Sequence, residues 1–565
     1  MYIKYFFSHK LLFIRLFVKF CNMKEMINNN KYLIFLLILT ILGLLIFCGH
    51  YSGILIDFGR EVYYPEQILQ GKILYKDLFN IYGPLSYQIN ALLYKMFGAK
   101  LATLYFSGCV CSILTISGIY LIAKKFFGEF LSFCIGFLTI SIGITTTSIF
   151  NYHFPYSWSV LYGLVSFLYS LYFLLKFNDD KKSLNLVISS FLAGICIANK
   201  YDFLLYGFVI LFFIIKNKDW KAFLSFISVP ILSFGILFIQ GLSVNDLINS
   251  LKITSEMAKS KTLTYFYQNS GIYFHPKALL ADLVSFLKCA IPFGAILYGA
   301  FAFNKNNKIL PISISILGYI GYLWFFSENV KTAFGFLPLC LLISTIAMYK
   351  KYDTKLLILV ISALAVSAKV FWVLLLYSYG NYYFPILLIA IFALIFKMLP
   401  EKLEKTAGIY LIIATILYLF TNFYMLSLAN NKVTTPKGTI YTVKDLAQST
   451  NELNDFINKA TNKTDKIVIF PEGMTVNFLT QRNSDDFYNS LLPLYIESLG
   501  EDKIINHYKE NMPEYIIFNN LNMKDYYFQY ICNDYALDFC GFVQENYNPI
   551  IVVDNGFRYM VFQHK

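Results

Sequence analysis

Long apolar runs occupy most of the first 428 residues of the chain. A helix that spans a bilayer needs about 20 mostly apolar residues, and roughly thirteen runs approach that length. They lie near residues 32–50, 100–123, 129–150, 156–175, 184–199, 201–215, 221–240, 279–303, 309–326, 332–349, 355–377, 382–397 and 407–426. The strands of a membrane β-barrel alternate apolar and polar residues over about ten positions, which these runs do not. The pattern predicts an α-helical polytopic membrane protein with about 13 transmembrane helices.

The pattern changes after about Leu428, where ordinary water-soluble sequence begins. Four short runs, DKIVIF, EYIIF, NPIIVVD and FRYMVFQ, have the composition of strands. VKDLAQSTNELNDFINKA and DKIINHYKEN have the spacing of amphipathic helices. This alternation predicts a small soluble α/β domain. We therefore divide the chain into a leader at 1–31, a transmembrane domain at 32–428 with its first outer loop at 51–99, and an α/β domain at 429–565.

The distribution of charge predicts how the chain crosses the membrane. Of the 565 residues, 57% are hydrophobic and 14% charged, and the net charge is +13. Lysines gather in alternate loops, as they do in cytoplasmic loops: Lys124, Lys125, Lys176, Lys181, Lys182, Lys216, Lys218, Lys221, Lys305, Lys308, Lys350, Lys351, Lys355, Lys397, Lys402 and Lys405. An odd number of spans from a cytoplasmic N-terminus then puts the first outer loop and the α/β domain outside. We expect a plasma (inner) membrane protein with a periplasmic or extracellular C-terminal domain, and lipid rather than nucleic acid as its charged neighbour.

The first 31 residues are basic and partly apolar. No small-residue cleavage site follows them, which argues against a removed signal peptide. We therefore expect a cytoplasmic or interfacial leader. Met1, Met23 and Met26 are all left open as the true start.

Cysteine and histidine usage points to no metal chemistry. Most of the ten cysteines lie in apolar runs, where they act as small apolar filler. Cys532 and Cys540 lie in the α/β domain, and a disulfide between them is left open. The six histidines form no HxxxH or Cys/His ligand spacing, so the sequence predicts no metal site and no cofactor.

Charge and tyrosine gather where the chain leaves its first apolar run, in DFGREVYYPEQILQGKILYKDLFNIYGP. If this stretch turns helical, Asp57, Arg60, Glu61 and Tyr64 fall at i, i+3, i+4 and i+7 on one face. Such a face would present two carboxylates, one guanidinium and one phenol at the bilayer surface. The alternative is a solvated helix start held by an ion pair.

The loop continues with a Gly-Lys-x-Leu-Tyr-x-Asp turn and then Tyr82-Gly83-Pro84-Leu85. This pattern resembles the first outer loop of polytopic glycosyltransferases of the C superfamily, which include aminoarabinose transferases and protein mannosyltransferase-like enzymes. TPKGTIYTV, IVIFPEGMTVNFLTQR and PLYIESL resemble the extracytoplasmic domain of bacterial members. The resemblance implies a polyprenyl-phosphate sugar donor and Asp57 as the catalytic base. Glu61 is the nearest second acid, although it lies four residues away rather than adjacent as in protein mannosyltransferases.

Such chemistry needs fixed cations, because the leaving phosphate gains negative charge as its bond to the sugar breaks. Arg60 is one candidate, and its alternative role is to hold Asp57 in place. Lys200 in ANKYDF and Lys331 in a short SENVK loop are others, or else interfacial lysines that reach to water. Arg482 in FLTQR could close over the site from the α/β domain, or be an ordinary surface arginine.

Other groups carry weaker indications. Asp282, Lys288 and Lys369 lie inside apolar runs, where charges are costly and often functional. They could line the groove for the lipid phosphate or a water cavity. Alternatively, Asp282 marks the outer end of its span and neighbouring helices satisfy Lys369. Tyr64, Tyr82 and His153 could contact the sugar or the acceptor, although aromatic residues are also common at membrane interfaces. Glu472 lies in a Pro-Glu-Gly turn, and the sequence assigns it no catalytic role.

The sequence therefore predicts a membrane glycosyltransferase that transfers a monosaccharide from a polyprenyl-phosphate donor to an unidentified lipid, glycan or protein acceptor. The resemblance implies direct displacement with inversion. A transporter or flippase of a lipid-linked glycan would show inverted repeats, and only Asn199 to Asp202 interrupts a span. A non-catalytic membrane scaffold is the third alternative.

Overall fold

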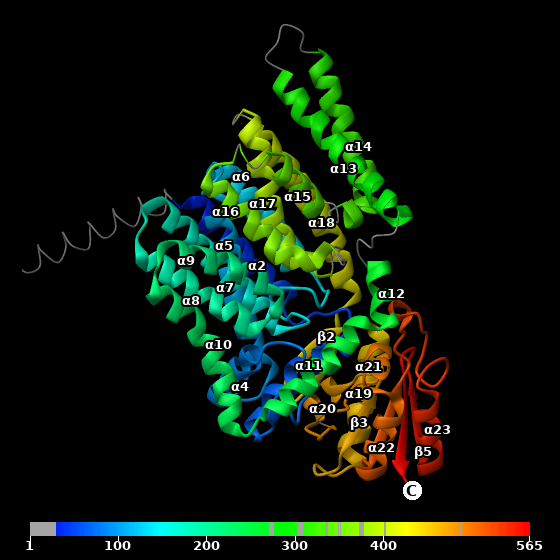
Figure 1. Ribbon diagram of the computed structural model, residues 1–565. Coiled ribbons are helices and arrows are strands. Elements are labelled where there is room, and N and C mark those ends of the chain that lie inside the picture. The colour runs from blue at the N-terminus through cyan, green and yellow to red at the C-terminus, as the bar shows by residue number, and fades with distance from the viewer. Residues whose placement is uncertain are drawn as a thin grey trace, which may run out of the picture.

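The computed structural model describes residues 30–270, 276–302, 309–333, 337–348, 350, 352–371, 378–400, 403–485 and 487–565. The leader predicted at 1–31, with its alternative start positions, lies almost wholly outside the described residues. The described chain forms a helical body with a smaller domain of mixed helices and strands at one end (Figure 1). The predicted fold class, a helical membrane protein with a C-terminal α/β domain, is confirmed.

Every predicted span falls on a helix. These helices are α2 (Lys31–Phe47), α5 (Leu101–Ala123), α6 (Glu129–Gly143), α7 (Trp158–Asp180), α8 (Ser183–Asn199), α9 (Leu204–Asn217), α10 (Trp220–Gln240), α13 (Pro276–Ala302), α14 (Ile309–Ala333), α15 (Leu337–Met348), α16 (Thr354–Ser367), α17 (Gly380–Met398) and α18 (Glu404–Leu428). In the described part of the chain, 6 helices are long and apolar enough to cross a membrane by length and composition. They are α5, α7, α10, α13, α17 and α18. The number of crossings stays a prediction.

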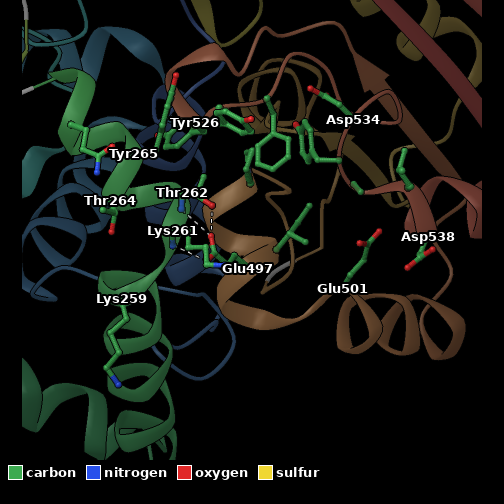
Figure 2. Close-up of a pocket in the computed structure, with 18 residues that line it drawn as sticks. Lys259, Lys261, Thr262, Thr264, Tyr265, Glu497, Glu501, Tyr526, Asp534 and Asp538 are labelled. Atoms are coloured by element: carbon green, nitrogen blue, oxygen red, sulfur yellow. Dashed lines mark hydrogen bonds between the residues drawn. The ribbon is translucent and has the colours of Figure 1, made fainter.

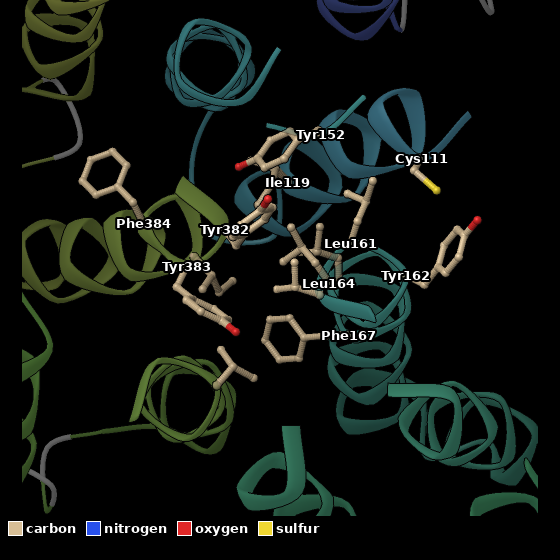
Figure 3. Packing of buried hydrophobic residues seen from close by; sticks show 14 of the residues in the cluster. Cys111, Ile119, Tyr152, Leu161, Tyr162, Leu164, Phe167, Tyr382, Tyr383 and Phe384 are labelled. Atoms are coloured by element: carbon tan, nitrogen blue, oxygen red, sulfur yellow. The ribbon is translucent and has the colours of Figure 1, made fainter. Parts of the chain in front are cut away.

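The interior of the helical body lies between α5, α7 and α17. Figure 3 shows Ile119 of α5 and Leu164 of α7 near Tyr382 and Tyr383 of α17. Small residues let the backbone of the outer connections enter this interior. A Cβ at Gly108 of α5 would lie 1.8 Å from the carbonyl oxygen of His153, so only glycine fits there. The connection between α6 and α7 is thereby pressed against the bundle.

The first outer loop contains two helices, α3 (Phe58–Leu69) and α4 (Leu85–Phe97). The predicted helix after the first span is confirmed, and it begins one residue after Asp57. Between the helices, the carboxylate of Asp77 accepts the backbone N–H of Ile73 at 2.8 Å and closes the predicted turn. The loop is therefore a folded unit rather than a solvated linker.

A second outer connection joins α10 to α13 and was not predicted from the sequence. It contains α11 (Val244–Lys259) and α12 (Lys261–Ser270). A capping box between Ser243 and Asp246 starts α11. Figure 1 shows both helices beside the C-terminal domain, where α12 contacts α21 (Pro493–Leu499) and the short helix η6 (Lys524–Tyr526). This connection forms one wall of a cleft described below.

The C-terminal domain holds a four-stranded sheet in the order β3-β4-β6-β5. β3 and β4 are parallel, and the other neighbours are antiparallel. All four predicted strands are confirmed, and a hairpin precedes them. A disulfide joins Cys532 to Cys540. The elements are β1 (Asn431–Thr435), β2 (Gly438–Thr442), α19 (Lys444–Ala460), β3 (Ile467–Phe470), α20 (Met474–Thr480), α21 (Pro493–Leu499), α22 (Glu501–Glu510), β4 (Tyr515–Asn519), η6 (Lys524–Tyr526), α23 (Leu537–Asn546), β5 (Tyr547–Asp554) and β6 (Arg558–His564).

The C-terminal domain packs directly on α3. A Cβ at Gly59 would lie 2.5 Å from the backbone nitrogen of Thr475, so the start of α20 touches the helix backbone itself. Three polar contacts extend this interface along α3. The Tyr63 hydroxyl accepts the Ser484 N–H, the Asn489 amide donates to the Tyr64 hydroxyl, and Lys437 pairs with Glu66 at 2.5 Å. The interface fixes the first turn of α3, where Asp57 lies.

Candidate active site

Asp57 lies at the junction between the first span and α3. Its backbone has φ +60°, a region that favours glycine, so surrounding contacts must hold it there. Its carboxylate pairs with the Arg60 guanidinium at 2.9 Å, one helical turn on. The side chain is 24% exposed, whereas Arg60 and Glu61 are buried. Asp57 therefore keeps access to solvent that its charged neighbours lack.

Arg60 is held in place by Glu61 and the aromatic residues around it. Its Nε donates to Glu61 Oε1 at 3.2 Å and to the Tyr87 hydroxyl at 3.1 Å. Glu61 also accepts the Tyr87 hydroxyl at 2.8 Å and the backbone N–H of Trp158 at 2.9 Å. Burial raises the pKa of Glu61, while Arg60 and the Trp158 N–H lower it. These contacts hold Glu61 and Arg60 in fixed positions, and the catalytic role that the resemblance implies for Glu61 stays a prediction.

Lys200 lies beside Arg60 across one aromatic ring. The Arg60 guanidinium carbon is 5.2 Å from the centre of the Tyr82 ring, and the Lys200 ammonium is 4.6 Å from it. Lys200 follows the last residue of α8 and is 2% exposed. Its ammonium also donates to the Tyr156 hydroxyl. Two predicted phosphate ligands and one predicted sugar contact are thus brought together.

Asp202 joins Lys200 to a second lysine. Its Oδ2 lies 3.5 Å from the ammonium of Lys200 and 3.5 Å from that of Lys369. Lys369 follows α16, in the short helix η4 (Ala368–Phe371), and lies 4.6 Å from the centre of the Tyr379 ring. One carboxylate between two cations leaves an excess of positive charge. This part of the site is suited to an anion.

The C-terminal domain adds a second carboxylate beside Asp57. Glu472 Oε2 accepts the backbone N–H of Asp57 at 2.8 Å, and Glu472 Oε1 accepts the Ser490 hydroxyl at 3.1 Å. Glu472 is 4% exposed. Its backbone carbonyl accepts the Asn519 amide at 3.0 Å, which ties the turn to β4. Glu472 thus supports the unusual backbone of Asp57 from a different domain.

The environment of Glu472 favours its protonated form. Burial is the main cause that raises the pKa of Glu472 to about 7, and the nearby charge of Asp57 adds to it. Arg60 and the N–H of Asp57 act in the opposite direction. A carboxyl group that changes charge near neutral pH therefore lies in contact with the residue predicted to be the base.

Two of the predicted sugar contacts are engaged in packing. The Tyr64 hydroxyl accepts a hydrogen bond from the Asn489 amide. His153 is fully buried, and its Nδ1 lies 3.2 Å from the hydroxyl of Tyr51. Burial lowers the pKa of His153 to about 3, so its ring stays neutral. The structure places both side chains in the aromatic interior, and their contact with a sugar stays a prediction.

The remaining predicted phosphate ligands are not brought to Asp57 by any contact of the described residues. Arg482 donates to Thr461 Oγ1 at 3.0 Å, to the Thr480 carbonyl at 2.6 Å and to the Ile457 carbonyl at 3.4 Å. Its guanidinium thereby ties the end of α19 to the end of α20. The SENVK segment with Lys331 was expected to be a loop, which is wrong because α14 continues to Ala333. The side chain of Lys331 lies outside the described residues, as does that of Asp282.

Two cavities lie near this charged cluster. One, of about 490 Å³, adjoins Ile56, next to Asp57, and is lined by Leu55, Ile149 and Met425 among other largely apolar residues. A larger one, of about 900 Å³, lies between α12 and the C-terminal domain. Figure 2 shows Tyr265 and Thr262 on one wall of the larger cavity and Asp534 and Asp538 on the other. An apolar groove and a polar cleft are thus both available.

No metal centre is apparent in the described ranges of the chain. Within them, no group of three or more His, Cys, Asp and Glu side chains is arranged to hold a metal ion.

Residues 82–243 match the family model of dolichyl-phosphate-mannose-protein mannosyltransferase. The match includes Tyr82, Lys200 and Asp202. It begins after Asp57, so Asp57 lies outside it. The resemblance to C-superfamily glycosyltransferases is thereby confirmed. Over this part of the chain the protein is similar to a family of membrane glycosyltransferases. No curated protein matches the sequence.

The fold is also similar to solved structures. An oligosaccharyltransferase from Archaeoglobus fulgidus, in complex with Zn and sulfate, has a TM-score of 0.46 and 14% identity over 86% of this chain and 68% of its own. ArnT from Cupriavidus metallidurans, bound to undecaprenyl phosphate, has a TM-score of 0.45 and 10% identity over 94% of this chain and 98% of its own. The site is argued from this chain's own contacts.

Sequence reasoning missed one member of the cluster and left the role of another open. Glu472 was considered only as a turn residue, because nothing in a Pro-Glu-Gly turn shows that it packs on Asp57 from about 415 residues away. Lys369 was noted as a costly charge in an apolar run but was not assigned to the site. The signal that could have found both is the same: a charged residue with no partner nearby in the sequence needs a distant one.

Proposed function

We propose that the protein transfers a monosaccharide from a polyprenyl-phosphate donor to an acceptor outside the cytoplasm, with Asp57 as the general base. The observation that carries this proposal is the continuity of the charged cluster. Asp57 pairs with Arg60, Arg60 and Lys200 share the Tyr82 ring, and Asp202 links Lys200 to Lys369. A base and an anion site thus lie side by side.

The donor would bind by its phosphate at the cationic part of this cluster. Arg60, Lys200 and Lys369 would neutralise the charge of the phosphate. The ion pairs of Asp202 with the two lysines would weaken as the lysines bind the phosphate. The groove beside Ile56 has a largely apolar lining suited to the first isoprene units of the lipid. The matched family is named for a dolichyl-phosphate sugar, which agrees with a lipid phosphate donor.

The reaction would be a direct displacement at the anomeric carbon. Asp57 takes the proton of the attacking hydroxyl or amine while the new glycosidic bond forms. The bond from the anomeric carbon to the phosphate oxygen breaks, and its electron pair stays on the lipid phosphate. The three cations stabilise this charge, so the leaving group needs little acid catalysis. Attack from the opposite face of the sugar inverts the anomeric configuration.

The orientation proposed from the lysine distribution fits this chemistry. Asp57 and the C-terminal domain lie on the side predicted to face the periplasm or its equivalent. A polyprenyl carrier keeps its tail in the bilayer and presents its sugar at that surface. The acceptor would therefore be a lipid, glycan or protein of the cell envelope.

The donor class can be tested with purified protein in lipid nanodiscs. The protein is incubated with labelled sugars carried either on undecaprenyl phosphate or on nucleotides, together with an envelope extract from cells that lack the protein. We expect transfer of label only from the lipid-linked donors. Transfer from a nucleotide sugar alone would refute the proposed donor.

A further inference from the structure

The larger cavity opens between two parts of the chain that are far apart in sequence. One wall is α12, which the Glu497 carboxylate of α21 fixes by accepting the backbone N–H groups of Lys261 at 2.7 Å and Thr262 at 3.0 Å. The other wall is the segment from Tyr526 to Asp538. Its volume of about 900 Å³ lies within the roughly 300–1,000 Å³ of typical ligand sites.

One residue of the cleft lining has a buried hydroxyl without a hydrogen bond. The Tyr535 side chain lines the cleft and is 6% exposed, and its hydroxyl has no partner among the residues that the structure describes. A buried polar group without a hydrogen bond destabilises the folded protein. A ligand that supplies a donor or an acceptor at this point would remove that destabilisation.

The charges of the cluster around Asp57 influence two tyrosines of the cleft. Burial raises the pKa of Tyr526 most, and the negative charges of Asp57 and Glu472 raise it further. The pKa of Tyr535 is also raised by burial, with a smaller contribution from Glu472. Both phenols thus lie within electrostatic reach of the carboxylates at the proposed base.

The lining of the cleft favours a neutral ligand rich in hydroxyl groups. Aromatic rings line it, with Tyr265 against Tyr527 at 5.2 Å and Phe528 against Tyr535 at 5.3 Å between ring centres. Aromatic faces pack against the C–H faces of sugar rings, and carboxylates and phenols bind their hydroxyls. The described lining includes four carboxylates and only two lysines, which disfavours a phosphorylated ligand: Glu497, Glu501, Asp534, Asp538, Lys259 and Lys261.

A peptide fits the cleft less well. An extended peptide commonly binds by adding a strand to an exposed sheet edge. The described lining residues come from α11, α12, α21, α22, α23, η6 and turns, and none belongs to a strand. Backbone pairing therefore has no template in this cleft.

From these observations we infer that the cleft between α12 and the C-terminal domain binds the acceptor, and that the acceptor is a carbohydrate. The inference rests on the proposed function, since it assigns the second substrate of the same reaction. It gives the C-terminal domain the role of choosing the acceptor. Tyr526 and Tyr535 are then contacts of the acceptor, and replacing them should not change binding of the donor.

The test uses full-length protein in nanodiscs, the labelled undecaprenyl-phosphate sugar that the wild type consumes, and a deletion-strain envelope extract. The variants are Tyr535→Phe and Tyr526→Ala, and the control is Tyr530→Phe in the same segment outside the cleft. We expect Tyr535→Phe to raise the apparent KM for the extract about 3- to 10-fold, the equivalent of one hydrogen bond. Tyr526→Ala should raise it further, while binding of undecaprenyl phosphate stays at the wild-type level. Glycosidases, and not proteases, should release the label from the product.

The outcomes separate the two proposals. If the wild type neither binds undecaprenyl phosphate nor transfers sugar, the proposed function itself fails. If the wild type does both but the two variants behave like Tyr530→Phe, the acceptor cleft is wrong. Parallel loss of lipid binding and transfer would also overturn it, because the tyrosines would then support the fold or the donor site. Label attached to peptide would refute the carbohydrate.

Discussion

Asp57 and Glu472 show how one residue can depend on another from a distant part of the chain. Glu472 holds the backbone N–H of Asp57, and Asp57 keeps a backbone conformation that L-residues rarely adopt. The sequence predicted Asp57, Arg60 and Lys200 because each lies in a short motif near the end of a span. It could not predict Glu472, because its role depends entirely on how the C-terminal domain docks.

Replacing Glu472 by Gln should change how stability depends on pH. The pKa of Glu472 rises from an ordinary 4.5 to about 7 in the folded protein, so the folded state binds more protons between these values. The free energy of unfolding then falls as pH rises through this window, by about 3 kcal/mol in total. The side chain in Glu472→Gln cannot ionise, so the free energy of unfolding of this variant should not show this fall with rising pH. Thermal unfolding of both proteins from pH 4.5 to 8 measures it.

The exposed Glu510→Gln serves as the control for this experiment, since it removes a carboxylate from the surface of α22. Its pH dependence should follow that of the wild type. A pH dependence of Glu472→Gln equal to that of the wild type would contradict a buried, protonated Glu472.

Lys200 and Lys369 should bind the donor phosphate together. Replacing either by Met removes one cation and leaves Asp202 paired with the other. We expect the affinity for undecaprenyl phosphate to fall at least tenfold in each variant, measured by titration in nanodiscs. Lys524→Met, on the surface of the C-terminal domain, should bind normally. Unchanged affinity in both site variants would exclude these lysines from the donor site.

At the scale of elements, the first turn of α3 and the start of α20 form one structural unit. Their backbones approach at Gly59, where a Cβ would meet the nitrogen of Thr475 at 2.5 Å. The sequence predicted α3 and its charged face correctly because the spacing of charges along a helix is local information. It did not predict α11 and α12, whose amphipathic pattern interrupts a long apolar region. Packing between distant elements leaves no such local signal.

Gly59→Ala should weaken this docking. The added methyl group has no room against the backbone of α20, and overpacking of this kind costs about 1–3 kcal/mol. We expect a lower melting temperature and a loss of transferase activity, because Glu472 would move away from Asp57. Gly541→Ala in α23 is the matched control, since a Cβ at Gly541 meets nothing within 4 Å. Equal behaviour of the two variants would mean that the close approach is not needed.

At the scale of the whole molecule, the apolar runs predicted the order and nearly the extent of the helices. An apolar run of this length is enough to predict a membrane helix, because the thickness of the hydrocarbon core fixes the length of a span. The α/β domain was also predicted, because its strands and helices have distinct periods. How the domain covers the outer loops was beyond sequence reasoning. It follows from shape at Gly59 and from ion pairs such as Lys437 with Glu66.

The proposed orientation can be checked by labelling in intact cells. Lys524→Cys places a thiol on the surface of the C-terminal domain, and Lys181→Cys places one in the lysine-rich turn between α7 and α8. We expect a membrane-impermeant maleimide to label the first and not the second. Permeabilised cells, in which both should react, provide the control. Labelling of Lys181→Cys alone would invert the topology and place Asp57 on the cytoplasmic side.

The most direct measurement is sugar transfer by Asp57→Asn in the nanodisc assay with a lipid-linked donor. An amide of nearly the same shape can keep a bond to Arg60 but cannot take a proton. We predict that transfer falls by at least a hundredfold, in line with general base catalysis, while undecaprenyl phosphate binding and the melting temperature stay near wild type. Asp525→Asn, an exposed residue of the C-terminal domain, should retain full activity. Transfer by Asp57→Asn at the wild-type rate would contradict the central role given to this carboxylate.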